Sequence, residues 1–127
     1  MKKILISSFL LLILLSICIF NMKFVNDISY ESINYLDEMN ELNNLDVEYE
    51  NLTKTYNKFA EYWKQKSDVL STLISHEPLE KITELISKLS IALKYNDKFE
   101  ISENINAIKT KMIEFSDSSE LNFKNLF

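Results

Sequence analysis

The pattern of apolar and polar positions changes character once along the chain, near residue 22. Residues 4–22 form a long, mostly apolar run that contains no charge, no glycine and no proline. A helix rises about 1.5 Å per residue, so these 19 residues would span roughly 28 Å, close to the ~30 Å hydrocarbon core of a bilayer. The pattern therefore predicts a transmembrane helix over residues 4–22, followed by a polar domain.

After this run, apolar residues recur at intervals of three and four, which is the spacing of a helix that buries one face. The first stripe is ragged and is expected to continue the membrane helix outward over residues 23–45, with a break at Asn43-Asn44 and an N-cap for the next helix at Asp46. The second stripe is a heptad seam with one polar member, Lys66. It could pack as a coiled coil against another helix of this chain or against a second copy. The members of the two stripes are Ile28, Ile33, Leu36, Met39 and Leu42, and then Tyr49, Leu52, Tyr56, Phe59, Trp63, Lys66, Leu70 and Leu73.

Two further helices are predicted after a break at Pro78, which suits the first turn of a new helix and makes an unbroken coiled coil less favoured. Residues 95–97 have the composition of a turn, and Asp97 with Glu100 resembles a capping box. Residues 116–119 are expected to act as a short polar breaker. The apolar stripes of these helices are Leu79, Ile82, Ile86, Leu89 and Leu93, and then Ile101, Ile105, Ile108, Met112 and Phe115.

The predicted fold is all-α, with an N-terminal transmembrane helix followed by a small antiparallel helical bundle. Short connections favour antiparallel neighbours, and a chain with no glycine and one proline is poorly suited to turn-rich β architecture. The expected organisation is a cytoplasmic N-terminus at 1–3, the transmembrane helix at 4–22, an acidic juxtamembrane helix at 23–45, a helical hairpin bundle at 46–117 and an apolar C-terminal tail at 118–127.

Charge indicates the orientation and limits the partners. Lys2 and Lys3 precede the apolar run, and Lys23 is the only cation between that run and Lys54. Because positively charged flanks stay in the cytoplasm, we expect the N-terminus inside, the domain outside and membrane lipid around the first helix. Beyond the two N-terminal lysines, 12 Lys stand against 19 acidic residues, a net charge of −7 that argues against nucleic acid as a partner, because nucleic acid needs a basic surface.

The charge is also unevenly distributed along the exterior part. Residues 24–53 contain eight acidic residues and no lysine, whereas the rest of the chain is balanced. The simplest interpretation is a solvated helix face, and the alternative is a surface for a basic partner or for divalent cations. The usage of Asn, Ile and Lys, with no Arg, is typical of AT-rich bacterial genomes.

Two other interpretations of the N-terminus concern processing. A cleaved signal peptide has a shorter apolar core and small residues before the cut, which Ser16-Ile17-Cys18 does not offer. A lipoprotein signal would share Leu15 and Cys18 but needs a small residue in place of Ile17. We therefore expect an uncleaved anchor, and the single cysteine excludes an internal disulfide.

Candidate functional residues are few. His76 is the only histidine, whereas a zinc site needs three or four nitrogen or sulfur ligands. The chain also lacks the glycines of a phosphate-binding loop, so we predict no enzyme, no cofactor and no metal site. Both Trp63 and His76 also have a structural interpretation. Trp63 would be a core residue of the heptad seam, and His76 would be a helix-corner residue with local contacts. The candidate partner contacts are Trp63, His76, Glu77, Leu121, Phe123, Leu126 and Phe127.

Four short motifs occur along the chain in a recognisable order. They are Tyr62-Trp63-Lys64, Ile74-Ser75-His76-Glu77, the hairpin from Ile82 to Tyr95, and Glu120 to Phe127. In these motifs the chain resembles domain-of-unknown-function family four-three-six-three, small single-span helical proteins of Clostridia and relatives. The resemblance covers nearly the whole chain, and it implies an anchored helical domain without assigning an activity. The family often has two adjacent histidines where this chain has Ser75-His76, and the resemblance implies a multi-pass membrane protein of the YetF type as a partner.

Two functional classes follow from these features. The first is a non-enzymatic, membrane-anchored extracytoplasmic domain that binds or stabilises a membrane-protein partner, or pairs with itself as a homodimer. The second is an extracytoplasmic helical bundle that senses a ligand or pH. His76 is the candidate for sensing pH, because histidine is the side chain that ordinarily changes charge near neutral pH.

Overall fold

The computed structural model describes residues 1–45 and 49–126, with side chains described as far as residue 119. These residues form helices and short connections, with no strand among them, so the predicted all-α fold is confirmed. The helices are α1 (Lys2–Asn44), α2 (Tyr49–Leu70), α3 (His76–Lys94) and α4 (Lys98–Leu126).

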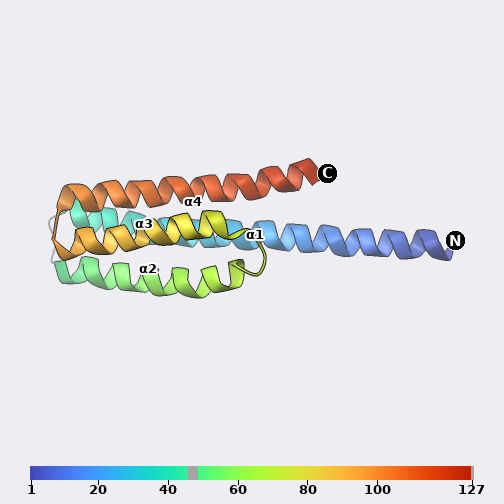
Figure 1. Cartoon of the computed structure of the whole chain (residues 1–127), viewed down its shortest axis with the longest axis horizontal. Helices are drawn as coiled ribbons and strands as arrows, with labels where there is room; N and C mark the ends of the chain where they lie inside the picture. Colours follow the sequence, from blue (N-terminus) through green and yellow to red (C-terminus); the bar gives the residue numbers. More distant parts are fainter. Residues whose placement is uncertain (46–48, 127) are drawn as a thin grey trace.

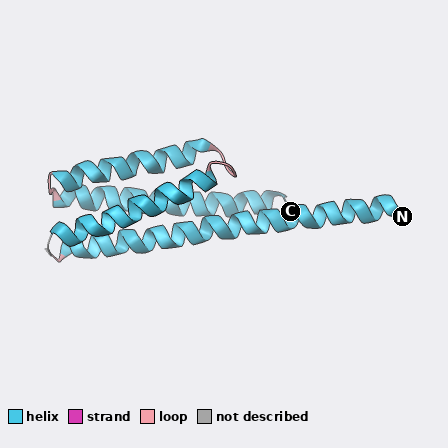
Figure 2. Ribbon diagram, turned by 90° about the horizontal axis from the view of Figure 1, so that it is seen from below, coloured by secondary structure: helices cyan, strands magenta, loops and turns pink. Residues whose placement is uncertain are grey.

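The four helices run alternately up and down and form one antiparallel bundle (Figure 1). The N-terminal end of α1 projects alone beyond this bundle, past the end of α4, in both views (Figures 1 and 2). By length and composition α1 is able to cross a membrane, and none of its most apolar window is buried by the rest of the chain. The helix therefore divides into an uncovered apolar half and a half that belongs to the bundle.

The juxtamembrane segment is a full member of the bundle. It continues the apolar run as one unbroken helix that ends at Asn44, as the Asn43-Asn44 pair predicted. Its inward face buries Val25, Ile28 and Leu36, so the bundle begins near residue 25 and includes four helices, not the segment 46–117 alone. The proposed N-cap Asp46 lies outside the described residues.

The acidic residues of the juxtamembrane segment lie on the opposite face of the same helix. Asp27, Glu31, Asp37, Glu38 and Glu41 are all exposed. The interpretation of this segment as a solvated helix face therefore holds for its described part. Burial on one side and charge on the other is the arrangement of a surface helix that packs on a core.

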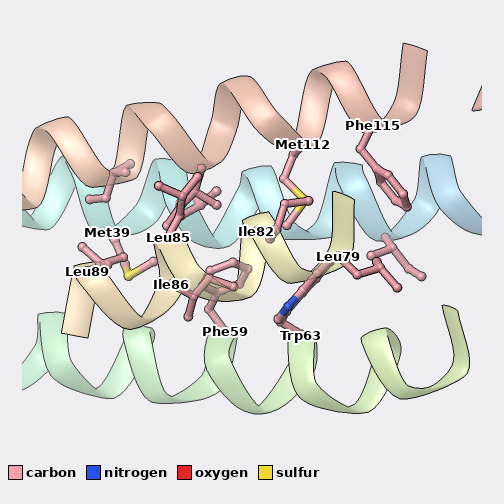
Figure 3. Close-up of a cluster of buried hydrophobic side chains, with 14 of the residues drawn as sticks. Met39, Phe59, Trp63, Leu79, Ile82, Leu85, Ile86, Leu89, Met112 and Phe115 are labelled. Atoms are coloured by element: carbon pink, nitrogen blue, oxygen red, sulfur yellow. The ribbon is translucent and has the colours of Figure 1, made fainter. Parts of the chain in front are cut away.

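The core is assembled from the predicted stripes (Figure 3). Every member of the α3 and α4 stripes is buried, which confirms both. In the α2 seam Tyr56 and Lys66 are half-buried, Tyr49 and Leu73 at its two ends are exposed, and the other members are buried. The seam therefore packs within this chain. The buried members of α2 are Leu52, Thr55, Phe59, Trp63 and Leu70.

The helix starts follow local chemistry. Ser75 occupies the N-cap of α3 in an extended conformation, and Pro78 lies in the first turn, where its missing N–H leaves no bond unmade. Asn96 adopts φ 50°, a left-handed conformation that asparagine tolerates better than most residues. Asp97 Oδ1 then accepts a hydrogen bond from the Glu100 N–H at 3.2 Å, so the predicted cap is confirmed.

The predicted polar breaker at residues 116–119 is wrong, because α4 continues as a helix to Leu126. Serine is only a weak helix breaker, and the segment contains neither glycine nor proline. In addition, the Ser116 hydroxyl donates a hydrogen bond to Asn26 Oδ1 of α1, which ties this turn to the bundle. The side chains of the predicted tail contacts, Leu121, Phe123, Leu126 and Phe127, lie outside the described residues.

Candidate functional site

Polar contacts fix the register between α1 and α4 along the bundle. They are spaced over most of the paired length, and each joins a side chain of one helix to the backbone or a side chain of the other. Residue numbers rise along α1 as they fall along α4, which defines an antiparallel register. The contacts are Ser116 Oγ to Asn26 Oδ1, Ser29 Oγ to Met112 O at 3.0 Å, Lys109 Nζ to Asp37 Oδ1 at 2.5 Å, and Asn43 Nδ2 to Lys98 O at 3.0 Å.

The register carries the end of α4 beyond the other bundle helices. One residue forward on α1 is matched by one residue backward on α4, so residues 121–126 lie beside residues 15–20 of the apolar run. Figure 1 shows the same arrangement, with α4 extending past the α2–α3 connection alongside α1. The tail backbone is therefore placed at the level of the apolar half of α1.

We call this end of the bundle the base, which consists of the α2–α3 corner (residues 69–77) and the parts of α1 and α4 that face it. A groove of about 1170 Å³ opens at the base between α1, α3 and α4. It exists because α3 begins at His76 while α1 and α4 continue beyond that level. Apolar side chains lining it include Met22, Val25, Ile82 and Phe115, and charged ones include Glu77, Glu80, Lys81, Glu84, Lys111 and Glu114.

The α2–α3 corner is a tight turn with exposed apolar side chains. The Leu73 and Ile74 N–H groups donate to the Leu70 carbonyl at 2.9 and 3.0 Å, which closes the turn over the buried Leu70 side chain. Val69 and Leu73 remain 47% and 42% exposed. The corner thus combines a hydrogen-bonded turn with uncovered apolar surface.

The predicted contact residues fall into separate parts of the molecule. His76 and Glu77 are exposed at the corner, and Glu77 lines the groove. Trp63 lies among the core side chains (Figure 3) and is only 2% exposed. Its Nε1–H donates to Thr83 Oγ1 at 3.0 Å, so it offers no surface to a partner in this structure. Its burial follows from its place in the heptad seam, which the sequence indicated as the alternative.

A lysine–aromatic cluster joins α1 and α2 on the side away from α4. Lys66 Nζ lies 5.9 Å from the Phe24 ring centroid and 5.7 Å from that of Tyr62, within the range of a cation–π interaction. Burial raises the pKa of the Tyr62 hydroxyl to about 12, and the negative field of Glu31 adds to the effect. The sequence pattern identified Lys66 as the polar member of the heptad seam. It could not predict the contact with Phe24, because that residue lies 42 positions earlier in the chain.

The described residues include no group of three or more His, Cys, Asp or Glu side chains that could hold a metal ion. Cys18 is half-buried at the edge of the groove. The features that the structure gathers at the base are an apolar groove floor, a charged rim and exposed apolar corner residues. These are features of a contact surface.

The family model described as Domain of unknown function (DUF4363) matches residues 19–126, so the chain belongs to this family, as the resemblance predicted. The match begins within the last turn of the apolar run and includes all four bundle helices. No curated protein and no solved structure matches the chain.

Proposed function

We propose that this protein is a non-enzymatic, membrane-anchored extracytoplasmic domain that binds or stabilises another membrane protein. In this proposal residues 4–22 span the bilayer, the N-terminus faces the cytoplasm and the four-helix bundle lies outside. The observation that carries it is the continuity of α1, whose apolar half and bundle half form one helix of 43 residues without a break.

The uncovered half of α1 supports the membrane part of the proposal. Its leucine, isoleucine and phenylalanine side chains are exposed around the helix axis and contact no other helix of the chain along most of its length. A helix that is apolar all round is either buried in a large core or surrounded by lipid. The bundle supplies no such core for this half, so lipid is the solvent that suits it.

The base supports the partner part of the proposal. Its groove lies where the apolar half of α1 meets the bundle, so a helix of a second membrane protein that leaves the bilayer here would reach it. The apolar floor could bury such a helix, and the charged rim could select its polar residues. A multi-pass membrane protein, including one of the YetF type, and a second copy of this chain are the partner classes that fit.

Anchoring and orientation can be tested on the full chain in intact cells. We expect the protein to resist extraction by alkaline carbonate, and a C-terminal tag to be removed by externally added protease while an N-terminal tag is protected. Release into the soluble fraction would contradict the anchor. Protection of the C-terminal tag would contradict the orientation.

Partner binding can be tested with a photocrosslinking amino acid at Lys81, which lies on the groove rim and is exposed. The matched control is Lys58, an exposed lysine of α2 that does not line the groove. We expect a discrete adduct in native membranes from position 81 and none from position 58. An adduct of twice the chain mass identifies a homodimer, and no adduct from position 81 contradicts the groove as the binding surface.

The second candidate is a ligand-sensing or pH-sensing bundle, which the groove and the adjacent His76 support. In that case a small molecule should raise the melting temperature of the full chain in detergent. Glu77→Gln on the groove wall should weaken the effect, whereas Glu61→Gln, an exposed acidic residue of α2 that does not line the groove, should not.

A further inference from the structure

The height of the base relative to the apolar run is fixed by α1. The run ends at Met22, and Val25 is already buried in the core of the bundle. A helix rises about 1.5 Å per residue, so only about 4.5 Å separates the two positions. The headgroup region on each side of a bilayer is roughly 5–7 Å thick. If residues 4–22 span the hydrocarbon core, no water-filled gap separates the base from the lipid.

The α2–α3 corner lies at the same level. Lys66 of α2 lies over the Phe24 ring of α1, and the two helices run antiparallel, so the end of α2 and the corner after it are level with the last turn of the apolar run. The exposed apolar residues of this corner are therefore near the boundary between headgroups and acyl chains. The α1–α4 register places the backbone of residues 121–126 beside residues 15–20. If residues 4–22 span the bilayer, this is the acyl-chain side of the boundary.

We propose that the α2–α3 corner is a second membrane-contact site, at which Val69 and Leu73 insert into the outer interface of the lipid bilayer. The inference rests on the proposed function, because it requires residues 4–22 to span the membrane. Lipid is the occupant because the continuous helix leaves no room for another layer between the corner and the bilayer. The bundle then contacts the membrane at the corner as well as through the span.

The charges around the corner indicate what kind of contact this is. Asp68 and Glu77 oppose Lys64 and Lys66, so the corner carries no excess of positive charge. Attraction to anionic lipid needs clustered lysine or arginine, whereas insertion of apolar side chains does not. The contact should therefore persist in zwitterionic vesicles and at high salt.

The opposite end of the bundle provides a matched control. Ile91 of α3 is 58% exposed, at least as exposed as Val69 and Leu73. It lies near the far end of a helix of 19 residues, so roughly 20 Å of helix separates it from the corner. Exposure is similar at the two ends, and only their distance from the apolar run differs.

The experiment uses the full chain with Cys18→Ser, reconstituted in phosphatidylcholine vesicles, with an environment-sensitive fluorophore on a single introduced cysteine. The probe positions are Phe9→Cys in the apolar run, Leu73→Cys at the corner and Ile91→Cys at the far end. We expect blue-shifted emission and strong quenching by lipids with brominated acyl chains at positions 9 and 73. Position 91 should show neither, and anionic lipid should leave the pattern unchanged.

The outcomes separate this inference from the proposed function. Quenching at position 9 but not at position 73 overturns the corner contact and leaves the anchor intact. No quenching at position 9 and no flotation with the vesicles contradicts the anchor itself. Equal quenching at positions 73 and 91 shows that the whole bundle lies on the lipid, which also overturns a contact specific to the corner.

A second measurement removes the contribution of the fluorophore, which is itself apolar. The label is moved to Thr72→Cys, an exposed corner position, in chains with and without the pair Val69→Asn and Leu73→Asn. We expect quenching at position 72 to be lost in the Asn pair, with the circular dichroism spectrum unchanged. Unchanged quenching would assign the insertion to the label and overturn the inference.

Discussion

The two halves of α1 share one helix and differ in almost every other respect. In the N-terminal half the apolar side chains surround the axis and are exposed, whereas in the C-terminal half they form one buried stripe with acidic residues opposite. Continuity of the backbone joins a segment suited to lipid with a segment suited to the edge of an aqueous domain. Under the proposed function, the comparison teaches that anchoring and folding depend on one structural element but on different side chains.

The largest expected effect is on the bundle half of the molecule. Trp63→Ala removes a buried indole and its hydrogen bond to Thr83, and it should lower the free energy of unfolding by ~3–5 kcal/mol. A loss of this size would unfold a small domain, yet the chain should still fractionate with membranes because residues 4–22 are untouched. Denaturant unfolding in detergent and membrane fractionation measure the two properties separately.

The control for this change is Tyr30→Ala, which removes an aromatic side chain that is largely exposed on α1. It should change the free energy of unfolding by less than about 1 kcal/mol. If Trp63→Ala were equally mild, the indole would contribute little to the core. If it released the chain from membranes, the two halves would not be independent.

The comparison is sharpest when the same substitution is made in both halves of α1. Leu36 is 0% exposed and Leu12 is 61% exposed. Leu36→Ala should lower the free energy of unfolding by ~2–5 kcal/mol through lost burial and a cavity. Leu12→Ala should leave the unfolding of the bundle unchanged, because that side chain contacts none of it. Equal losses from both substitutions would show that the apolar half also packs on the bundle.

A charge in the apolar half of α1 should weaken membrane insertion and leave the stability of the bundle unchanged. Leu12→Lys places an ammonium group near the middle of the run, where insertion scales assign a penalty of about 2.5–3.5 kcal/mol. We expect weaker insertion, measured by glycosylation mapping of the exported chain, with unfolding of the bundle unaffected. Leu45→Lys is the control, because Leu45 is exposed beyond the end of α1 and its substitution should affect neither property. Undiminished insertion of Leu12→Lys would contradict the transmembrane assignment.

Every residue that the sequence periodicity assigned to the stripes of α3 and α4 is buried, although Leu85 and Ala92 of α3 are buried as well and were not predicted. The reason for the success is local. Each stripe member is buried because a helix repeats its face every three to four residues, whatever it packs against. The same rule placed Trp63 at a core position. At the base, the sequence identified His76 and Glu77 as a corner, and the structure adds the groove beside Glu77.

The parts that could not be predicted depend on contacts between distant segments. Ser29, Ser32 and Asn43 interrupt the apolar pattern of α1, so its stripe is ragged and its place in the bundle core was not predicted. They are buried, and Ser29 and Asn43 are satisfied by backbone carbonyls of α4. A local pattern contains no information about such partners, and for the same reason the groove and the lysine–aromatic cluster could not be foreseen.

These polar contacts provide a smaller test of the bundle half. Asn43→Ala removes a hydrogen bond to the Lys98 carbonyl from a buried position and should lower the free energy of unfolding by ~1–3 kcal/mol. Asn104 is the matched control, because its half-buried side chain donates to the Glu100 carbonyl of its own helix, α4. Asn104→Ala should have a negligible effect. Indistinguishable losses would show that the contact between α1 and α4 does not fix their register.

The smallest expected effect concerns alkaline pH and Tyr62. Its pKa is raised from 10.0 to about 12, first by burial and then by the field of Glu31, so the unfolded chain loses this proton before the folded chain does. The stability that Tyr62 contributes is therefore fully present below pH 10 and is lost as pH rises from about 10 to 12. Tyr62→Phe, which cannot ionise, should show a shallower loss of stability over that interval. Tyr62 is only half-buried, so solvent screening keeps the difference small, and identical slopes in the two chains would contradict a desolvated hydroxyl. Since Tyr62 lies on α2 against the bundle half of α1, the same titration should leave membrane attachment through residues 4–22 unchanged, which separates the two halves once more.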